Sequence, residues 1–171
     1  MLPFVLSLPD PNATLEAVGG KGRSLARLAR AGLPVPDGFH ITTAAYREFV
    51  AASGLQPHIL KMLGPVDVAI PATPEAASQA IGRLFALAPV PEEIERAICA
   101  DYEILGARPS LLSPKGTPVA VRSSATAEDL PGASFAGQQE TYLNIRGAFQ
   151  LMRYFPFFAK VVRIVHYRLG E

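Results

Sequence analysis

The sequence predicts an α+β fold, in which a helix-rich front part precedes a few strands gathered around one segment of small residues. Apolar residues recur at helical spacing in several windows between Gly22 and Leu105. Two apolar, strand-like runs flank a stretch of Ser, Thr, Ala and Gly between Val119 and Asn144. Sixteen prolines and fourteen glycines divide the chain, so each element is expected to be short.

The front part, residues 1–117, is expected to hold most of the helices. A short apolar run predicts a first strand, and capping residues, proline at a first turn and terminal glycines predict where helices begin and end. The expected elements are a strand over 4–8 and helices from Gly22 to before Gly32, from Thr42 or Thr43 to about Ala52, over 55–63, over 74–87, and from Pro91 to about Leu105.

The rest of the chain is expected to form two further parts. After a loop over 108–117, strands at Val119–Val121 and Thr141–Ile145 would carry the segment 118–146. Residues 147–171 interleave Phe, Met, Val and Ile with Arg and Lys, which predicts a basic amphipathic helix, broken or kinked at Pro156.

Composition bounds the class of protein. The chain has 171 residues, of which 49% are hydrophobic, enough for one domain with a core, and its net charge of +1 gives no reason to expect nucleic acid as a partner. A single cysteine, Cys99, excludes a disulfide within the chain. There is no basic leader and no apolar run of about 18 residues, so a cytoplasmic protein is expected.

Lys21 is the first candidate binding residue. It stands in Gly19-Gly20-Lys21-Gly22, directly before a predicted helix. Free N–H groups at a helix start favour anions, and glycines let a ligand approach the backbone. The pattern is not that of a P-loop, because Gly22 rather than Ser or Thr follows the lysine. The alternative is an ordinary turn with a solvated lysine.

Arg122 is the second candidate. It ends the apolar run Val119–Val121 and precedes Ser123-Ser124-Ala125-Thr126. A guanidinium at a strand end, followed by hydroxyls and small residues, is suited to binding phosphate oxygens. The alternative is a surface arginine paired with Glu128 or Asp129.

The remaining polar residues give no catalytic or metal site. Adjacent acids such as Glu128 and Asp129 point to opposite faces of a strand, which suits one metal ion poorly. The three histidines are scattered without ligand spacing. Ser134 does not stand in a G-x-S-x-G motif, so a serine hydrolase is not indicated.

Two blocks of sequence resemble a known family. VGGKGRSLARLARAGLPVPDGFHITTAAYREF and AVRSSATAEDLPGASFAGQQETYLNIRG are similar to two signatures of the phosphoenolpyruvate synthase and pyruvate phosphate dikinase family. The resemblance implies the N-terminal portion of an ATP-grasp nucleotide-binding domain. It implies that Lys21 and Arg122 contact ATP phosphates, and that Gly137 and Thr141 occupy further nucleotide-contacting positions.

The resemblance also implies a reaction. In such enzymes ATP and Mg²⁺ serve to phosphorylate a histidine on a mobile domain, which then carries the phosphoryl group to an acceptor. The family's metal ligands and phosphohistidine segment have no counterpart among these residues, so the chain by itself is expected to show weak or no turnover. Gly22 after Lys21 and the ending TYLNI favour a likeness to the rifamycin phosphotransferase branch over the pyruvate-using enzymes.

Other functions stay open on the sequence. The basic aromatic tail would also suit a non-catalytic regulatory or membrane-associated module that keeps the lobe as a scaffold. The chain could instead be one subunit of a split enzyme that pairs with a separate C-terminal half. Self-association through the tail helix is a further possibility.

Overall fold

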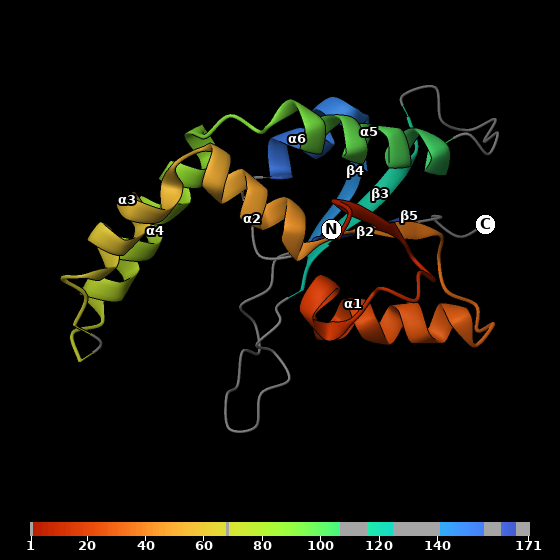
Figure 1. Ribbon diagram of the computed structural model, residues 1–171, viewed down its shortest axis with the longest axis horizontal. Coiled ribbons are helices and arrows are strands. Elements are labelled where there is room, and N and C mark those ends of the chain that lie inside the picture. The colour runs from red at the N-terminus through yellow and green to blue at the C-terminus, as the bar shows by residue number, and fades with distance from the viewer. Residues whose placement is uncertain (1, 68, 107–115, 125–140, 156–161, 167–171) are drawn as a thin grey trace.

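The computed structural model describes residues 2–67, 69–106, 116–124, 141–155 and 162–166, and Figure 1 shows their arrangement. Helices and an antiparallel sheet occur together, which confirms the α+β class. The elements are, in chain order, β1 Val5–Ser7, α1 Leu15–Arg30, β2 Gly38–Ile41, α2 Thr43–Ala52, α3 Leu55–Leu63, α4 Ala72–Leu87, α5 Glu92–Gly106, β3 Pro118–Ser123, β4 Thr141–Arg146, α6 Ala148–Tyr154 and β5 Val162–His166.

The sheet has the strand order β1-β2-β5-β3-β4, and every neighbouring pair is antiparallel. The last strand in the sequence, β5, therefore lies in the middle of the sheet, between β2 and β3. The pairing is non-local, because β5 joins the N-terminal strand pair β1–β2 to the strand pair β3–β4, which lies more than seventy residues further along the chain.

The prediction of a C-terminal helix over residues 147–171, broken or kinked at Pro156, is wrong for the described residues after Pro156. Among the described residues of this segment, Ala148–Tyr154 is helical and Val162–His166 is a strand. The segment VRIVH is rich in β-branched residues, which favour strands. Its backbone groups pair with strands on both sides, and this tertiary pairing outweighs the helical spacing of the apolar residues before it. The basic amphipathic tail helix, the basis for a membrane-associated module, is therefore interrupted.

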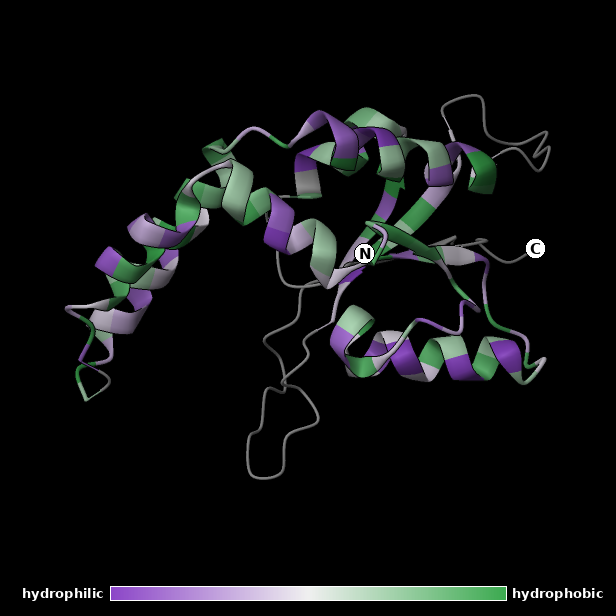
Figure 2. Ribbon diagram, in the orientation of Figure 1, coloured by the Kyte–Doolittle hydropathy of each residue, from purple (hydrophilic) through white to green (hydrophobic). Residues whose placement is uncertain are grey.

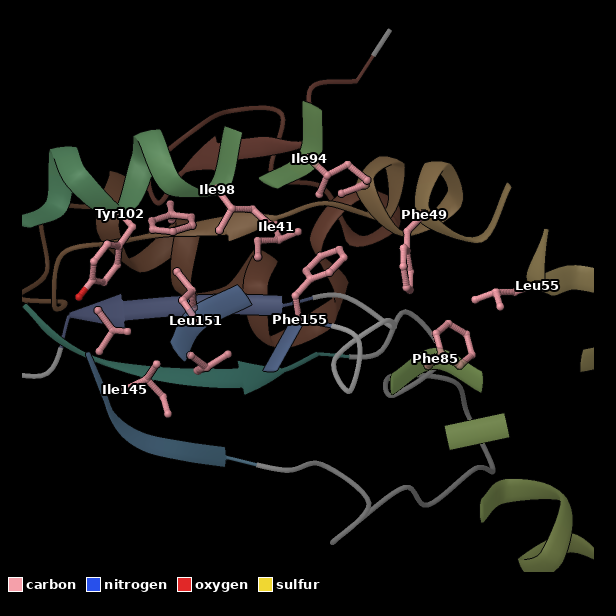
Figure 3. Close-up of a cluster of buried hydrophobic side chains, with 14 residues drawn as sticks. Ile41, Phe49, Leu55, Phe85, Ile94, Ile98, Tyr102, Ile145, Leu151 and Phe155 are labelled. Atoms are coloured by element: carbon pink, nitrogen blue, oxygen red, sulfur yellow. The ribbon is translucent and has the colours of Figure 1, made fainter. Parts of the chain in front are cut away.

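One face of the sheet carries the main core. Ile94, Ile98 and Tyr102 of α5 point towards the sheet and belong to one buried cluster with Ile41 of β2 (Figure 3). The fourteen buried residues of this cluster are Phe39, Ile41, Ala45, Phe49, Leu55, Phe85, Ile94, Ile98, Tyr102, Val119, Val121, Ile145, Leu151 and Phe155. We call this the α5 face, since α5 and α6 lie over it in Figure 1.

Helix α1 packs on the opposite face, which we call the α1 face (Figure 1). The buried cluster here is smaller and consists of Leu6, Ala13, Ala17, Val18 and Ala26. Hydrophilic and hydrophobic residues alternate along α1 in Figure 2, as expected for a helix with one buried side. The small side chains bring the helix close to the strands beneath it.

Helices α3 and α4 pack against each other and extend away from the sheet as an arm (Figure 1). The arm joins the core at its base, where the ring of Phe85 lies 5.9 Å from that of Phe49 and 6.2 Å from that of Tyr46. The predicted helix over 55–63 is confirmed, and α4 begins two residues before the predicted start at Pro74.

Candidate nucleotide-binding site

Helix α1 is broken at Gly19, where the GGKG sequence begins. The helix starts earlier than predicted, at Leu15, because the Thr14 hydroxyl accepts a hydrogen bond from the Ala17 N–H at 3.3 Å and caps it. Gly19 then adopts φ 70° and ψ 173°, a conformation open in practice only to glycine. The helix resumes after Gly19, so a second helix start lies inside α1. The first N–H groups of a helix lack intrahelical acceptors and favour anions.

Lys21 lies in the first turn after this break, and its side chain is exposed. The glycines around it, Gly19, Gly20 and Gly22, are buried. A Cβ atom on Gly22 would lie 2.9 Å from Cβ and Cγ2 of Val18, closer than real contacts allow. The same Cβ would lie 3.6 Å from Nδ1 of His40 on β2. The absence of a side chain at Gly22 thus lets the turn after the break pack against Val18, in the turn before it, and Gly22 itself lies over His40 of the sheet.

His40 supports this turn from below. Its ring is fully buried, and Nε2 lies 3.2 Å from the Leu8 carbonyl oxygen. The ring therefore links the residue under Gly22 to the chain segment after β1. The sequence predicted a structural or exposed histidine, but its place under the glycine turn depends on strand pairing and could not be seen from spacing.

Arg122 and Thr141 are brought together by the pairing of β3 with β4. They are directly opposite each other in the register, and both are exposed. Val119 and Val121 are buried on the α5 face, so alternation along β3 places Arg122 on the α1 face. Residues opposite each other in an antiparallel pair share a face, which places Thr141 there as well.

A single row of register partners connects this pair to the GGKG turn. His40 is opposite Arg163, and Arg163 is opposite Arg122. His40 and Arg122 are thus two strand spacings apart, about 10 Å between backbones. Because Gly22 lies over His40, the turn that carries Lys21 and the strand that carries Arg122 meet on the same face of the sheet.

The structure therefore gathers three of the four sequence-predicted residues on one face. Lys21, Arg122 and Thr141 lie there, and Gly137 lies outside the described residues. Glu128 and Asp129, offered above as partners of Arg122, also lie outside them. Two long cations near a helix start can offset the charge of an oligophosphate.

The opposite end of the β3–β4 pair is held by a buried tyrosine that the sequence gave no reason to single out. The Tyr102 hydroxyl donates to the Thr117 carbonyl at 2.6 Å and accepts from the Gly147 N–H at 2.7 Å. Thr117 precedes β3 and Gly147 follows β4, so α5 anchors both strands at this end. Arg122 stands near the other end of β3, away from this anchor.

A bulge in β4 separates the anchored end from Thr141. The register shifts between Val119 and Val121 of β3, and Asn144 on the opposite strand has φ 58°. The Asn144 side-chain oxygen accepts a hydrogen bond from Arg146 Nε at 3.0 Å. The extra residue lets both Tyr142 and Ile145 pack on the α5 face, and it preserves the pairing of Thr141 with Arg122.

Glu16 is the acidic residue in the first turn of α1. The pKa of Glu16 is lowered chiefly by a hydrogen bond from its own backbone, then by the Thr14 hydroxyl and the charge of Arg23.

Among the described residues, no group of three or more His, Cys, Asp or Glu side chains is placed to hold a metal ion. Within the same residues, no helix has the length and apolarity needed to cross a membrane.

Residues 15–165 match the pyruvate phosphate dikinase AMP/ATP-binding domain, a region that includes the GGKG turn and the β3–β4 pair. The chain belongs to this family. The match spans all elements from α1 to α6 and most of β5, so the likeness seen in the two sequence blocks extends through the intervening helices.

Relatives in several organisms agree with this assignment. A probable phosphoenolpyruvate synthase of Methanothermobacter thermautotrophicus is 46% identical over 136 residues, covering 80% of this chain and 19% of the relative. A phosphoenolpyruvate synthase of Aeropyrum pernix is 47% identical over 134 residues, covering 78% and 16%. A rifampicin phosphotransferase of Streptomyces is 38% identical over 153 residues, covering 88% and 17%. The chain thus spans less than a fifth of the length of these curated relatives.

Proposed function

We propose that this chain is the ATP-binding N-terminal part of a dikinase-type phosphotransferase, with ATP bound on the α1 face of the sheet. The observation that supports this most directly is the shared face of Lys21, Arg122 and Thr141, in a chain of the AMP/ATP-binding family. Lys21 and Arg122 would neutralise phosphate oxygens, and the N–H groups after Gly19 would donate to them. Thr141, beside Arg122, and Gly137 would contact the nucleotide as well.

The proposal extends to the reaction by likeness to the family. The phosphoryl group of ATP would pass to a histidine on a further domain, and the lobe would form part of an ATP-grasp domain. The residues described here hold the nucleotide and supply positive charge, which is the main protein contribution to phosphoryl transfer. Mg²⁺ would be held by residues outside this chain and would offset charge on the transferred group.

Two observations favour different acceptors for the phosphoryl group. The GGKG turn and the TYLNI ending favour a rifamycin phosphotransferase-like branch. The relatives of higher identity reported above carry the name phosphoenolpyruvate synthase, which makes pyruvate the alternative acceptor.

Calorimetric titration of the full chain with ATP tests the site. We expect Lys21→Ala and Arg122→Ala each to weaken binding about tenfold or more, because a hydrogen bond to a charged group contributes roughly 1.5–3 kcal/mol. Arg96→Ala is the matched control, since Arg96 is an exposed arginine on α5 paired with Glu92 at 3.1 Å. ATP affinity unchanged in both site variants, with a folded protein, would remove the assignment.

A further inference from the structure

Ser124 is a fully buried hydroxyl residue, with 0% of its surface exposed, one position after the end of β3. Its Oγ has no hydrogen-bond partner in the described part of the chain. A buried hydroxyl without a partner is unfavourable, and such groups in native proteins usually serve a purpose. The sequence offered Ser124 only as one of several small residues after Arg122.

The strand register places Ser124 at the same end of the sheet as the GGKG turn. Ser123 is opposite Val162, and Val162 is opposite Ile41. Ser123 and Ile41 are the last residues of β3 and β2, so Ser124 comes directly after the end of the sheet that these two strands share. Just beyond the end of β2, the Thr43 hydroxyl donates to the Glu16 carbonyl at 2.9 Å, which ties this end of the sheet to the first turn of α1. Ser124 therefore lies at the end of the sheet that is tied to the first turn of α1.

Ser124 is also close to Arg122 in the sequence. Arg122 lies on the α1 face, and Ser124 stands two positions further along the chain, directly after the end of β3. Ser124 thus combines three properties: burial, an unused donor, and a place two residues from a cation on the proposed nucleotide face.

We propose that the Ser124 hydroxyl binds a phosphate oxygen of ATP, next to the oxygens held by Arg122. This inference rests on the proposed function. In the free protein the donor is unused, and the bound phosphate supplies its acceptor. A hydroxyl donating to an anionic oxygen forms a charge-assisted bond, which is stronger than a neutral one.

The test compares Ser124→Ala with Ser123→Ala in the full chain. Ser123 is the matched control, because alternation along β3 turns its side chain away from Arg122 and towards the α5 face. We expect Ser124→Ala to weaken ATP binding about tenfold in calorimetric titration, and Ser123→Ala to leave the affinity within about twofold. Thermal unfolding without nucleotide is measured on the same samples.

The two measurements separate a ligand role from a structural one. A phosphate ligand predicts that Ser124→Ala unfolds at the same or a higher temperature without ATP, because the change removes a polar group that has no partner. A lower unfolding temperature together with unchanged ATP affinity would overturn the inference, as would equal loss of affinity in Ser123→Ala. If Arg122→Ala weakens binding and Ser124→Ala does not, the inference fails and the proposed function stands. If the wild-type chain binds no ATP, both fail.

Discussion

The two faces of the sheet are packed with side chains of different size. The α5 face buries fourteen residues, among them Phe39, Phe49, Phe85 and Phe155, whereas the described cluster on the α1 face has five, three of them alanines. Large side chains fix the position of the sheet by filling volume. Small side chains let a helix backbone come close to the strands, which a site for phosphate groups requires. The comparison indicates that packing stabilises mainly the α5 face, whereas the proposed ATP site lies on the more closely packed α1 face.

Truncation of one large side chain on each face gives the largest expected difference. Phe49 and Val18 are both fully buried, and Phe49 meets the rings of Phe85 and Phe155 at 5.9 and 5.5 Å. We expect Phe49→Ala to lower the free energy of unfolding by about 3–5 kcal/mol. Val18→Ala removes less apolar surface and should cost about 1.5 kcal/mol. Urea denaturation of both variants measures the difference, and equal losses would contradict the division between the faces.

How far the sequence predicts this arrangement depends on whether the signal is local. Helical spacing and proline or glycine boundaries predicted α2 to α5 within a few residues, because those signals lie inside each helix. The part of α1 before Gly19 was missed, because the predicted helix began only at Gly22. The strand β5 was missed because its partners, β2 and β3, lie far away in the chain.

In the candidate site, too, some features follow from local sequence and others only from tertiary pairing. Lys21 and Arg122 could be singled out by residue type and neighbours alone. That they share a face follows from the row through Arg163, which exists only because β5 lies between β2 and β3. The burial of Ser124 and the position of His40 under Gly22 are likewise products of pairing across the sheet. Local sequence thus predicted the charged groups, and tertiary structure supplied their geometry.

A pair of glycine substitutions tests the close packing of the α1 face. Alanine normally stabilises a helix interior relative to glycine by up to about 1 kcal/mol. At Gly22 the added Cβ would lie 2.9 Å from Val18, so we expect Gly22→Ala to destabilise the protein by about 1–3 kcal/mol. At Gly82 of α4 the added Cβ meets nothing within 4 Å, so Gly82→Ala should stabilise by about 0.5–1 kcal/mol.

Opposite signs in denaturant unfolding would support close packing at Gly22. Adding Val18→Ala to Gly22→Ala should recover part of the loss, because the nearest clashing atoms are Val18 Cβ and Cγ2 and the substitution removes Cγ2. If Gly22→Ala stabilised the protein as Gly82→Ala does, Gly22 would not lie as close to Val18 as the structure has it.

The smallest expected effect concerns the cap that starts α1. The Thr14 hydroxyl accepts from the Ala17 N–H at 3.3 Å, a long bond, and the side chain is exposed. Thr14→Ala should therefore cost about 0.5–1 kcal/mol, at the low end for a helix cap, and Thr14→Ser should cost less because it keeps the oxygen. A separate hydrogen bond, from the Thr43 hydroxyl to the Glu16 carbonyl, also holds the first turn of α1 in place. ATP affinity should thus be unchanged in Thr14→Ala, and a tenfold loss in calorimetry would mean that the cap, rather than the break at Gly19, positions the binding turn.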